Sequence, residues 1–244
     1  MTLAHGLSPV IDRLEFVLEN KVVPAPYDRW GARLLSHLNK PVQVVVTGFR
    51  SSGKSALIEM MSGRPVIGHQ LDVPVTELAF GESERALFEK SDGSVITEGG
   101  VLKDCTCPVD AVLARQELPD DGLRSHNFVE IGLRGSPEQK YAALEAVIAR
   151  GDVVIWCSET FGPEEQALWA EVPDQIKDHS FLVLAMADRQ VMRGSLTSNI
   201  ERLAPIVAEE FMGLFPIATI QGIVAQTAGE SLDDALWRSS GGRS

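Results

Sequence analysis

Short apolar runs alternate along the chain with longer stretches in which apolar residues recur every three or four positions. The short runs predict buried strands, and the longer stretches predict amphipathic helices. Core strands are expected from residue 42 into a glycine-rich loop, and at residues 127–132, 152–157, 181–186 and 215–220. Runs that are apolar throughout are typical of parallel strands covered on both faces. The pattern therefore predicts an α/β protein with a doubly wound, mostly parallel sheet.

The helices expected between these strands carry start signals. Ser136, Pro137 and Gln139 supply an N-cap, a proline at the first helical position and a capping-box glutamine. Further helices are expected over residues 163–172 and 197–213, with a short one near residues 231–237. This alternation with the strands predicts helices on both faces of the sheet.

The segment between the first two core strands has a different pattern. Residues 62–74 are rich in glycine, proline and polar residues and are expected to form a long loop. Strand-like residues follow at 77–81 and 85–89, and Ser91-Asp92-Gly93-Ser94 is typical of a hairpin turn, with 95–97 as the returning strand. Residues 100–117 are mixed, and a short helix is expected after Pro108.

Two amphipathic helices, over residues 8–20 and 27–39, are expected before the first core strand, separated by a break that holds two prolines. We therefore expect residues 1–40 to form a helical extension packed on a domain of residues 41–244. The alternative is that the two helices present a surface for a partner or a second copy of the chain.

Composition narrows the possible partners. The 244 residues carry a net charge of −12, which disfavours the phosphate backbone of nucleic acids and anionic membranes as main partners. No apolar run approaches the roughly 18 residues of a membrane span, and the N-terminus does not resemble a signal peptide. Three cysteines fit a reducing compartment better than a disulfide framework, so a cytoplasmic protein is expected.

Cys105 and Cys107 are separated by one residue, which raises the question of a metal site. Zinc sites draw four ligands at wider spacing, and only Cys157 remains as a further cysteine. The five histidines are scattered without ligand spacing. The sequence leaves open whether the two cysteines do more than fill space.

The strongest chemical signal is Gly48-x-x-x-x-Gly53-Lys54-Ser55, which follows an apolar strand and precedes a helical pattern. This is a phosphate-binding P-loop in the context that the motif requires. Lys54 is expected to reach the β- and γ-phosphates of a nucleotide and Ser55 to bind Mg²⁺. Backbone amides complete the phosphate cradle. The nucleotide-binding residues expected here are Gly48, Ser51, Ser52, Gly53, Lys54, Ser55 and Ala56.

The order of motifs resembles a P-loop GTPase G domain, most closely the bacterial dynamin-like or translation-factor-related large GTPases. The resemblance covers about residues 27–222. Besides the P-loop, it rests on Leu38-Asn39-Lys40-Pro41 before the first strand, Pro74-Val75-Thr76 with its threonine 22 residues after Lys54, Asp188 after an apolar strand, and the last strand at 215–220.

The resemblance implies roles for two further residues. Thr76 would be the first-switch threonine that completes the Mg²⁺ shell and senses the γ-phosphate, an element that orders and disorders with the nucleotide. Asp188 would accept hydrogen bonds from guanine. The alternatives are a β-branched residue at a strand start for Thr76 and a helix N-cap for Asp188.

The chain also departs from the family pattern. Where the family has an aspartate followed three residues later by glycine, this chain has Glu130-Ile131-Gly132-Leu133. Glu130 could reach Mg²⁺ through water, with Gly132 or Gly135 in place of the hinge glycine. In Ala185-Met186-Ala187-Asp188, a methionine replaces the lysine that would pack on the base. Weaker guanine selectivity is therefore expected, with ATP as the alternative nucleotide.

Arg50 lies inside the P-loop, where the resemblance implies a residue that helps to organise the attacking water. The catalytic residues expected are Arg50, Lys54 and Thr76, and a solvated loop arginine is the alternative for Arg50. The implied function is a Mg²⁺-dependent GTP-binding switch with slow or partner-dependent hydrolysis. The resemblance also implies a homodimer or protein partner at the switch face. A non-hydrolysing scaffold and an ATP-dependent P-loop enzyme are the alternatives.

Overall fold

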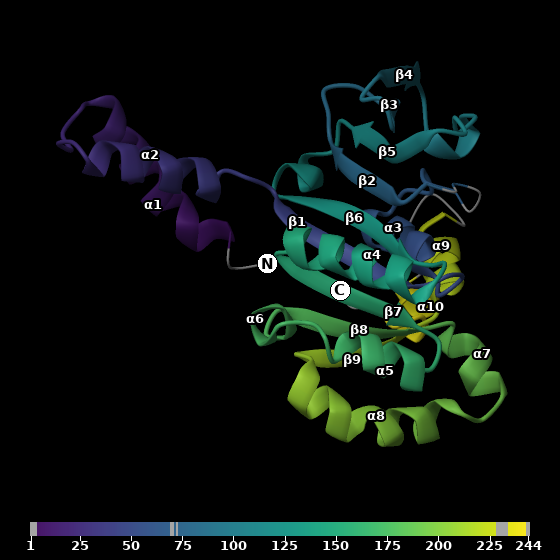
Figure 1. Cartoon of the computed structure of the whole chain (residues 1–244). Coiled ribbons are helices and arrows are strands. Elements are labelled where there is room, and N and C mark those ends of the chain that lie inside the picture. The colour runs from purple at the N-terminus through teal and green to yellow at the C-terminus, as the bar shows by residue number, and fades with distance from the viewer. Residues whose placement is uncertain (1–3, 69–70, 72, 228–233, 243–244) are drawn as a thin grey trace. The chain divides into compact units, whose positions relative to one another are not determined.

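A computed structural model describes residues 4–68, 71, 73–227 and 234–242 of the chain (Figure 1). The chain forms two compact units, residues 1–41 and 42–244. Each unit has internal packing of its own.

The smaller unit is a pair of helices, α1 (Ala4–Glu19) and α2 (Tyr27–Leu38), as the hydrophobic spacing predicts. The helices approach closely where Gly31 meets Leu18, because a Cβ built on this glycine would lie 2.9 Å from a leucine methyl carbon. Phe16 and Trp30 remain 64% and 60% exposed. The packing of residues 1–40 on the larger unit stays a prediction.

The larger unit is built on a nine-stranded sheet in the order β4-β3-β5-β2-β6-β1-β7-β8-β9 (Figure 1). The strands are β1 (Val42–Phe49), β2 (Val75–Phe80), β3 (Arg85–Lys90), β4 (Val95–Gly99), β5 (Ala111–Leu118), β6 (His126–Leu133), β7 (Val153–Ser158), β8 (Ser180–Ala185) and β9 (Gly213–Ile217). Strands β6, β1, β7, β8 and β9 run parallel to one another. The mostly parallel α/β sheet expected from the sequence is therefore confirmed.

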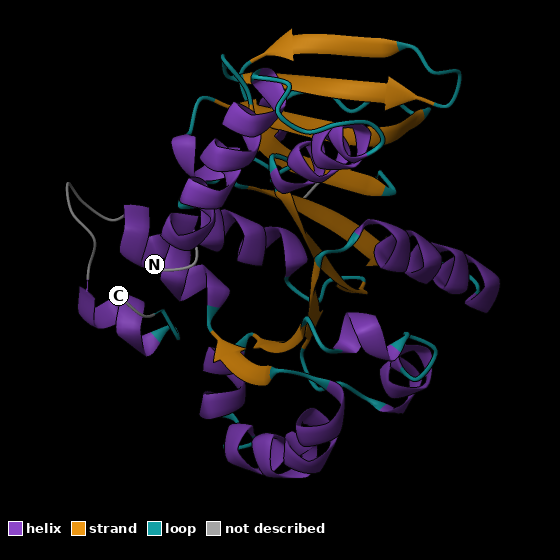
Figure 2. Cartoon of the chain, turned by 90° about the vertical axis from the view of Figure 1, so that its left-hand side faces the viewer, coloured by secondary structure: helices purple, strands orange, loops and turns teal. Residues whose placement is uncertain are grey.

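Helices cover both faces of this sheet (Figure 2). The helices of this unit are α3 (Lys54–Ser62), α4 (Pro137–Arg150), α5 (Pro163–Trp169), α6 (Asp174–Lys177), α7 (Ala187–Met192), α8 (Leu196–Glu210), α9 (Thr219–Thr227) and α10 (Asp234–Ser239), with 3-10 turns at Leu102–Asp104 and Asp121–Arg124. Neighbouring strand residues point to opposite faces. Val45 thus joins the core under α4, α5 and α8, whereas Val46 joins the core under α3.

The capping box predicted for α4 is present. The Ser136 side chain accepts a hydrogen bond from the Gln139 amide, and the Gln139 side chain accepts one from the Ser136 amide. This start of α4 follows β6 after only residues 134–136.

The prediction of a short helix after Pro108 is wrong, because residues 111–118 form strand β5. This strand pairs with β2 on one edge and β3 on the other, and its alternate residues Ala114, Gln116 and Leu118 are buried. Sheet pairing on both edges outweighs the helical spacing of the local apolar residues. The strands predicted on either side of the 91–94 turn are confirmed as β3 and β4.

The strand expected at residues 215–220 is correct only in part. Strand β9 ends at Ile217, and helix α9 begins at Thr219. The helix packs on α3 through Gly222, where a Cβ would lie 2.5 Å from the Met60 side chain. Of the short helix expected near 231–237, residues 231–233 lie outside the described residues, and α10 covers the remainder.

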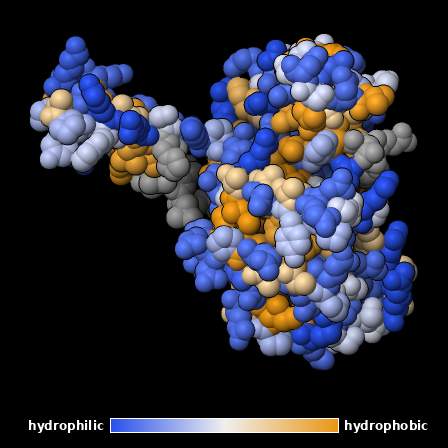
Figure 3. Space-filling model, viewed as in Figure 1, coloured by the Kyte–Doolittle hydropathy of each residue, from blue (hydrophilic) through white to orange (hydrophobic). Residues whose placement is uncertain are grey.

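Apolar residues on the face seen in Figure 3 form separate patches among polar side chains. Among the helices that the structure describes, none combines the length and the apolar character needed to cross a membrane.

Candidate functional site

The candidate site begins at the loop between β1 and α3. Gly48 and Gly53 have φ angles of 143° and 91°, in the region that favours glycine. A Cβ on Gly48 would also lie 2.1 Å from the carbonyl oxygen of Cys157, so no larger residue fits there. The start of the loop therefore packs closely against the end of β7.

Lys54 is the first residue of α3, and its side chain is only 6% exposed. Its ammonium group donates to the Phe49 carbonyl oxygen at 2.7 Å and to the Ser52 hydroxyl at 3.4 Å. Burial lowers the pKa of Lys54, and the nearby Arg134 lowers it further, while Glu130 acts in the opposite direction. An anion bound at this loop would stabilise the lysine's charge.

Ser55 and Thr76 face the same carboxylate. The Ser55 hydroxyl donates to Glu130 Oε2 at 2.7 Å. Thr76, 5% exposed, lies directly opposite Glu130 in the antiparallel pair formed by β2 and β6. Two hydroxyls and a carboxylate therefore converge beside the phosphate loop, and oxygen donors of this kind suit Mg²⁺.

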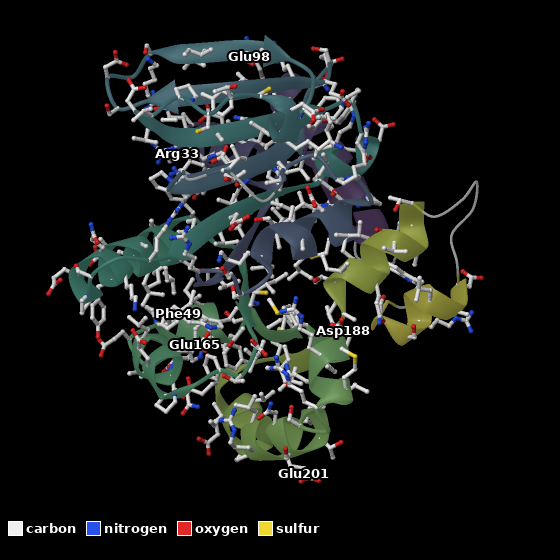
Figure 4. The ribbon with its side chains drawn as sticks, turned by 90° about the vertical axis from the view of Figure 1, so that its right-hand side faces the viewer. Arg33, Phe49, Glu98, Glu165, Asp188 and Glu201 are labelled. Carbon is white, nitrogen blue, oxygen red and sulfur yellow. The ribbon has the colours of Figure 1, made fainter. Side chains whose placement is uncertain are left out.

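Asp188 lies at the other end of the site, in the first turn of α7 (Figure 4). Strand β8, expected at residues 181–186, stops at Ala185, and Met186 is the N-cap of α7, so Asp188 lies in a helix. The N-cap alternative for Asp188 is excluded by the same geometry. Arg189 follows, and its guanidinium lies 3.4 Å from the sulfur of Met186.

Buried polar contacts hold α7 in place behind Asp188. The Gln190 side chain is 2% exposed and donates to the Glu159 carbonyl oxygen at 2.7 Å. Its amide oxygen accepts a hydrogen bond from Asn199 at 2.9 Å. Asp188 therefore projects from an anchored helix rather than from a loose loop.

These two ends share one pocket of about 780 Å³. Of the nucleotide-site residues expected from the sequence, those that line it are Ser51, Gly53, Lys54, Ser55, Ala56 and Asp188, joined by Arg50 and Thr76. Gly48, near the end of β1, and Ser52, in the loop that follows, are both buried. Residues expected from separate motifs thus line one pocket.

The pocket also contains residues that sequence reasoning did not select. Arg134 enters from the end of β6, Arg189 from α7, and Thr219 and Ile220 from the start of α9. With Arg50 and Lys54, the two arginines give four cationic side chains against the carboxylates of Glu130 and Asp188. In a chain of net charge −12, this local excess of positive charge favours an anionic ligand.

One of the three cysteines contacts the phosphate loop, because the Cys157 thiol donates to the Ser52 carbonyl oxygen at 2.9 Å. All three are free thiols, and burial raises the pKa of Cys157 to about 12. The pKa of Cys105 is also raised, chiefly by burial. The part of the chain that the structure describes holds no group of three His, Cys, Asp or Glu residues arranged to bind a metal.

Comparison with known proteins relates this architecture to solved structures. No protein-family model and no curated protein sequence matches the chain. Two structures of an oligomerised bacterial dynamin pair, described as sensing and tethering membranes over long range, match with TM-scores of 0.61 and 0.66. Their sequences are 19% and 14% identical, and the matches cover 94% and 96% of this chain.

The chain spans only 38% and 41% of the length of those bacterial dynamin chains. Era of Aquifex aeolicus bound to GDP and aluminium fluoride also matches, with a TM-score of 0.44, 13% identity, and coverage of 75% of this chain and 52% of that one. At the identities of the two dynamin matches, it is the fold that is shared. The chain therefore has the α/β fold of a P-loop GTPase G domain and resembles bacterial dynamin.

Proposed function

We propose that the chain is a Mg²⁺-dependent GTP-binding protein that hydrolyses GTP slowly or with the help of a partner, and so acts as a nucleotide-controlled interaction switch. The observation that carries this proposal is the single pocket that joins buried Lys54 and the Ser55–Glu130 contact to Asp188. Such a pocket has a cationic cradle at one end and a carboxylate for a base at the other.

Lys54 and the loop amides of residues 51–56 bind the phosphates in this proposal. Arg50 is exposed at the mouth of the same loop, where its charge can stabilise a phosphoryl transition state. Thr76 completes the Mg²⁺ shell from β2. These three side chains, Arg50, Lys54 and Thr76, are the proposed catalytic group.

The proposed metal ligands are the hydroxyls of Ser55 and Thr76. Glu130 accepts the Ser55 hydrogen bond and fixes that hydroxyl toward the pocket. A bound Mg²⁺ would neutralise charge on the phosphates. When nucleotide binds without the metal, Ser55 and Glu130 remain bonded to each other and contribute little to phosphate affinity.

Asp188 is the proposed guanine reader, because a carboxylate accepts hydrogen bonds from the two donors on that base edge. Met186 and Arg189 lie beside it where a purine face would pack. An adenine presents no matching pair of donors to Asp188. Guanine is thus preferred, although only one charged residue makes the distinction.

A partner is proposed at the switch face, either a second copy or another protein. The oligomeric state described for the bacterial dynamin pair supports this suggestion. Three free thiols fit a reducing compartment, and the cytoplasm is the proposed location.

The test is binding of fluorescent GTP and ATP analogues with and without Mg²⁺ to the wild type and to the Lys54→Ala, Asp188→Ala and Lys103→Ala variants. GTP binding that requires Mg²⁺ is expected. Lys54→Ala should weaken it about 100-fold, since charge-assisted hydrogen bonds are lost. Asp188→Ala should remove the preference for GTP, and Lys103→Ala, on an exposed turn, should change nothing. Equal binding of both nucleotides, or none, would contradict the guanine proposal.

A second candidate is a non-hydrolysing scaffold of the same fold. It is favoured by one observation, the three-residue connection from β6 to α4, which leaves little room for a segment that positions water. Turnover that stays at background with every partner tested, while GTP binding persists, would favour this candidate.

A further inference from the structure

Arg134 occupies a place in the pocket that the proposed function has not used. It follows β6 directly, and the last residues of β6 and β1, Leu133 and Phe49, are paired in the sheet. Arg134 therefore leaves the sheet beside the point where the phosphate loop begins. Its side chain is half-buried and lines the pocket.

Arg134 lies close to Lys54. A Cβ built on Gly132 would lie 3.7 Å from Arg134 Nε and 3.8 Å from Lys54 Cε, so the two side chains flank the same point of the β6 backbone. Two cations this close repel each other, and a bound anion that contacts both would offset this repulsion in addition to the nearby carboxylate of Glu130. The bound terminal phosphate of a nucleotide, which Lys54 reaches in the proposed function, is such an anion.

Arg134 also contacts the second flank of the pocket. Its guanidinium donates a hydrogen bond to the carbonyl oxygen of Val73, which is 3% exposed and lies three residues before Thr76. This single side chain therefore joins the end of β6 to the segment that leads into β2. A guanidinium carries five N–H donors in a planar fork, so it can bind a phosphate and a carbonyl together.

The backbone on either side of Arg134 is held firmly. Residues 134–136 connect β6 to the capped start of α4, and Gly135 packs against Gln139 at a φ of 88°. A connection this short cannot undergo the large loop movement by which a second switch could report the nucleotide state. A side chain that reaches across the pocket can do so instead.

We infer that Arg134 is a positioning residue that binds the terminal phosphate of a nucleoside triphosphate and, through Val73, fixes the segment before Thr76 in response. The inference rests on the proposed nucleotide binding. A diphosphate lacks the group that Arg134 recognises, so the residue distinguishes the two nucleotide states.

The test compares the wild type with Arg134→Ala, Arg134→Gln and Arg150→Ala. Arg150 is the matched control, because its guanidinium also holds β2, through Glu77 at 2.9 Å, but lies at the far end of α4. Affinities for a non-hydrolysable GTP analogue and for GDP are measured with Mg²⁺, together with hydrogen exchange of residues 73–80 in each state.

In the wild type, the triphosphate analogue is expected to slow exchange at residues 73–76 more than GDP does. Arg134→Ala should reduce the ratio of triphosphate to diphosphate affinity about tenfold or more, as expected for a lost charge-assisted contact. It should also abolish the difference in exchange. Arg134→Gln keeps a donor for Val73 and removes the charge. It should therefore remain folded and show the same fall in the ratio of triphosphate to diphosphate affinity. Arg150→Ala should leave both readouts as in the wild type.

A residue that only braced Val73 would behave differently. Its loss would lower thermal stability equally in all nucleotide states and leave the affinity ratio unchanged. That result in Arg134→Gln, or in Arg134→Ala, would overturn the inference while the proposed function stood. A wild type that binds neither nucleotide would overturn both.

Discussion

The two ends of the pocket, the phosphate end at Lys54 and the base end at Asp188, differ in how deeply their side chains are buried. At the phosphate end, Lys54 is 6% exposed and Thr76 5%, and Gly48 fits against a backbone carbonyl with no room for a Cβ. At the base end, Asp188 is half-buried and Arg189 is exposed. If the pocket binds a nucleotide as proposed, phosphate binding depends on the packing of the sheet itself, whereas base selection depends on a few side chains that can change without disturbing the core.

The largest effect is expected from Gly48→Ala. The added Cβ would meet the Cys157 carbonyl oxygen at 2.1 Å, at a φ of 143°. We expect the free energy of unfolding to fall by about 3 kcal/mol, as is typical where backbone strain and overpacking combine. Chemical denaturation would measure this loss, and nucleotide binding should disappear with it.

Gly99→Ala is the control, because nothing lies within 4 Å of a Cβ built on this glycine. Its unfolding free energy should stay close to that of the wild type. Equal stability of the two variants would contradict the tight packing described for the phosphate end.

The next effect concerns the metal. Glu130→Gln removes the charge that faces Ser55 and Thr76, so the gain in triphosphate affinity on adding Mg²⁺ should fall about tenfold, as for the loss of an outer-shell metal partner. Without Mg²⁺, in the presence of a chelator, the variant should bind at least as tightly as the wild type, because Lys54 then loses a competing carboxylate. Titration calorimetry would measure both. An unchanged response to Mg²⁺ would place the metal elsewhere.

A third comparison separates the two ends directly. Tripolyphosphate has the charge of the nucleotide's phosphates but no base. Its ability to displace a fluorescent GTP analogue should be lost in Lys54→Ala. The affinity of the Asp188→Ala variant for tripolyphosphate should stay within about twofold of the wild-type value, because this ligand has no base to contact residue 188. A large loss in Asp188→Ala would show that the two ends are energetically coupled.

The smallest effect is expected from Arg189→Ala. Its guanidinium, 3.4 Å from the Met186 sulfur, lies where a base would pack, and an exposed cation over an aromatic ring contributes about 0.5–1 kcal/mol. Affinity for GTP and ATP analogues should therefore fall about two- to fivefold. Affinity for tripolyphosphate should not change. If Arg189→Ala weakened the binding of tripolyphosphate more than that of the nucleotides, Arg189 would contact the phosphates and not the base.

The sequence predictions succeeded where local sequence determines the structure and failed where distant segments determine it. The P-loop was predictable because its function depends on residues adjacent in the chain, from Gly48 to Ser55, whose conformations glycine and a helix start impose locally. The core strands were predictable from continuous apolar runs. These features need no knowledge of the strand order.

Strand β5 and the Arg134 contact were not predictable for the opposite reason. Strand β5 exists because β2 and β3 pair with its two edges. Arg134 and Val73 are 61 residues apart in the sequence and meet only because β2 is the neighbour of β6. Likewise, the start of α9 reaches the pocket only through its packing on α3, which no local pattern indicates.

Because Thr76 lies within β2, its backbone becomes ordered when the protein folds and not when a ligand binds. Its backbone is paired on one side with Ala114 of β5 and on the other with Glu130 of β6. The conformational entropy of this residue is therefore lost when the sheet folds, not when a ligand arrives. In a protein that acts as proposed, the metal would meet a hydroxyl that the folded sheet already holds in place.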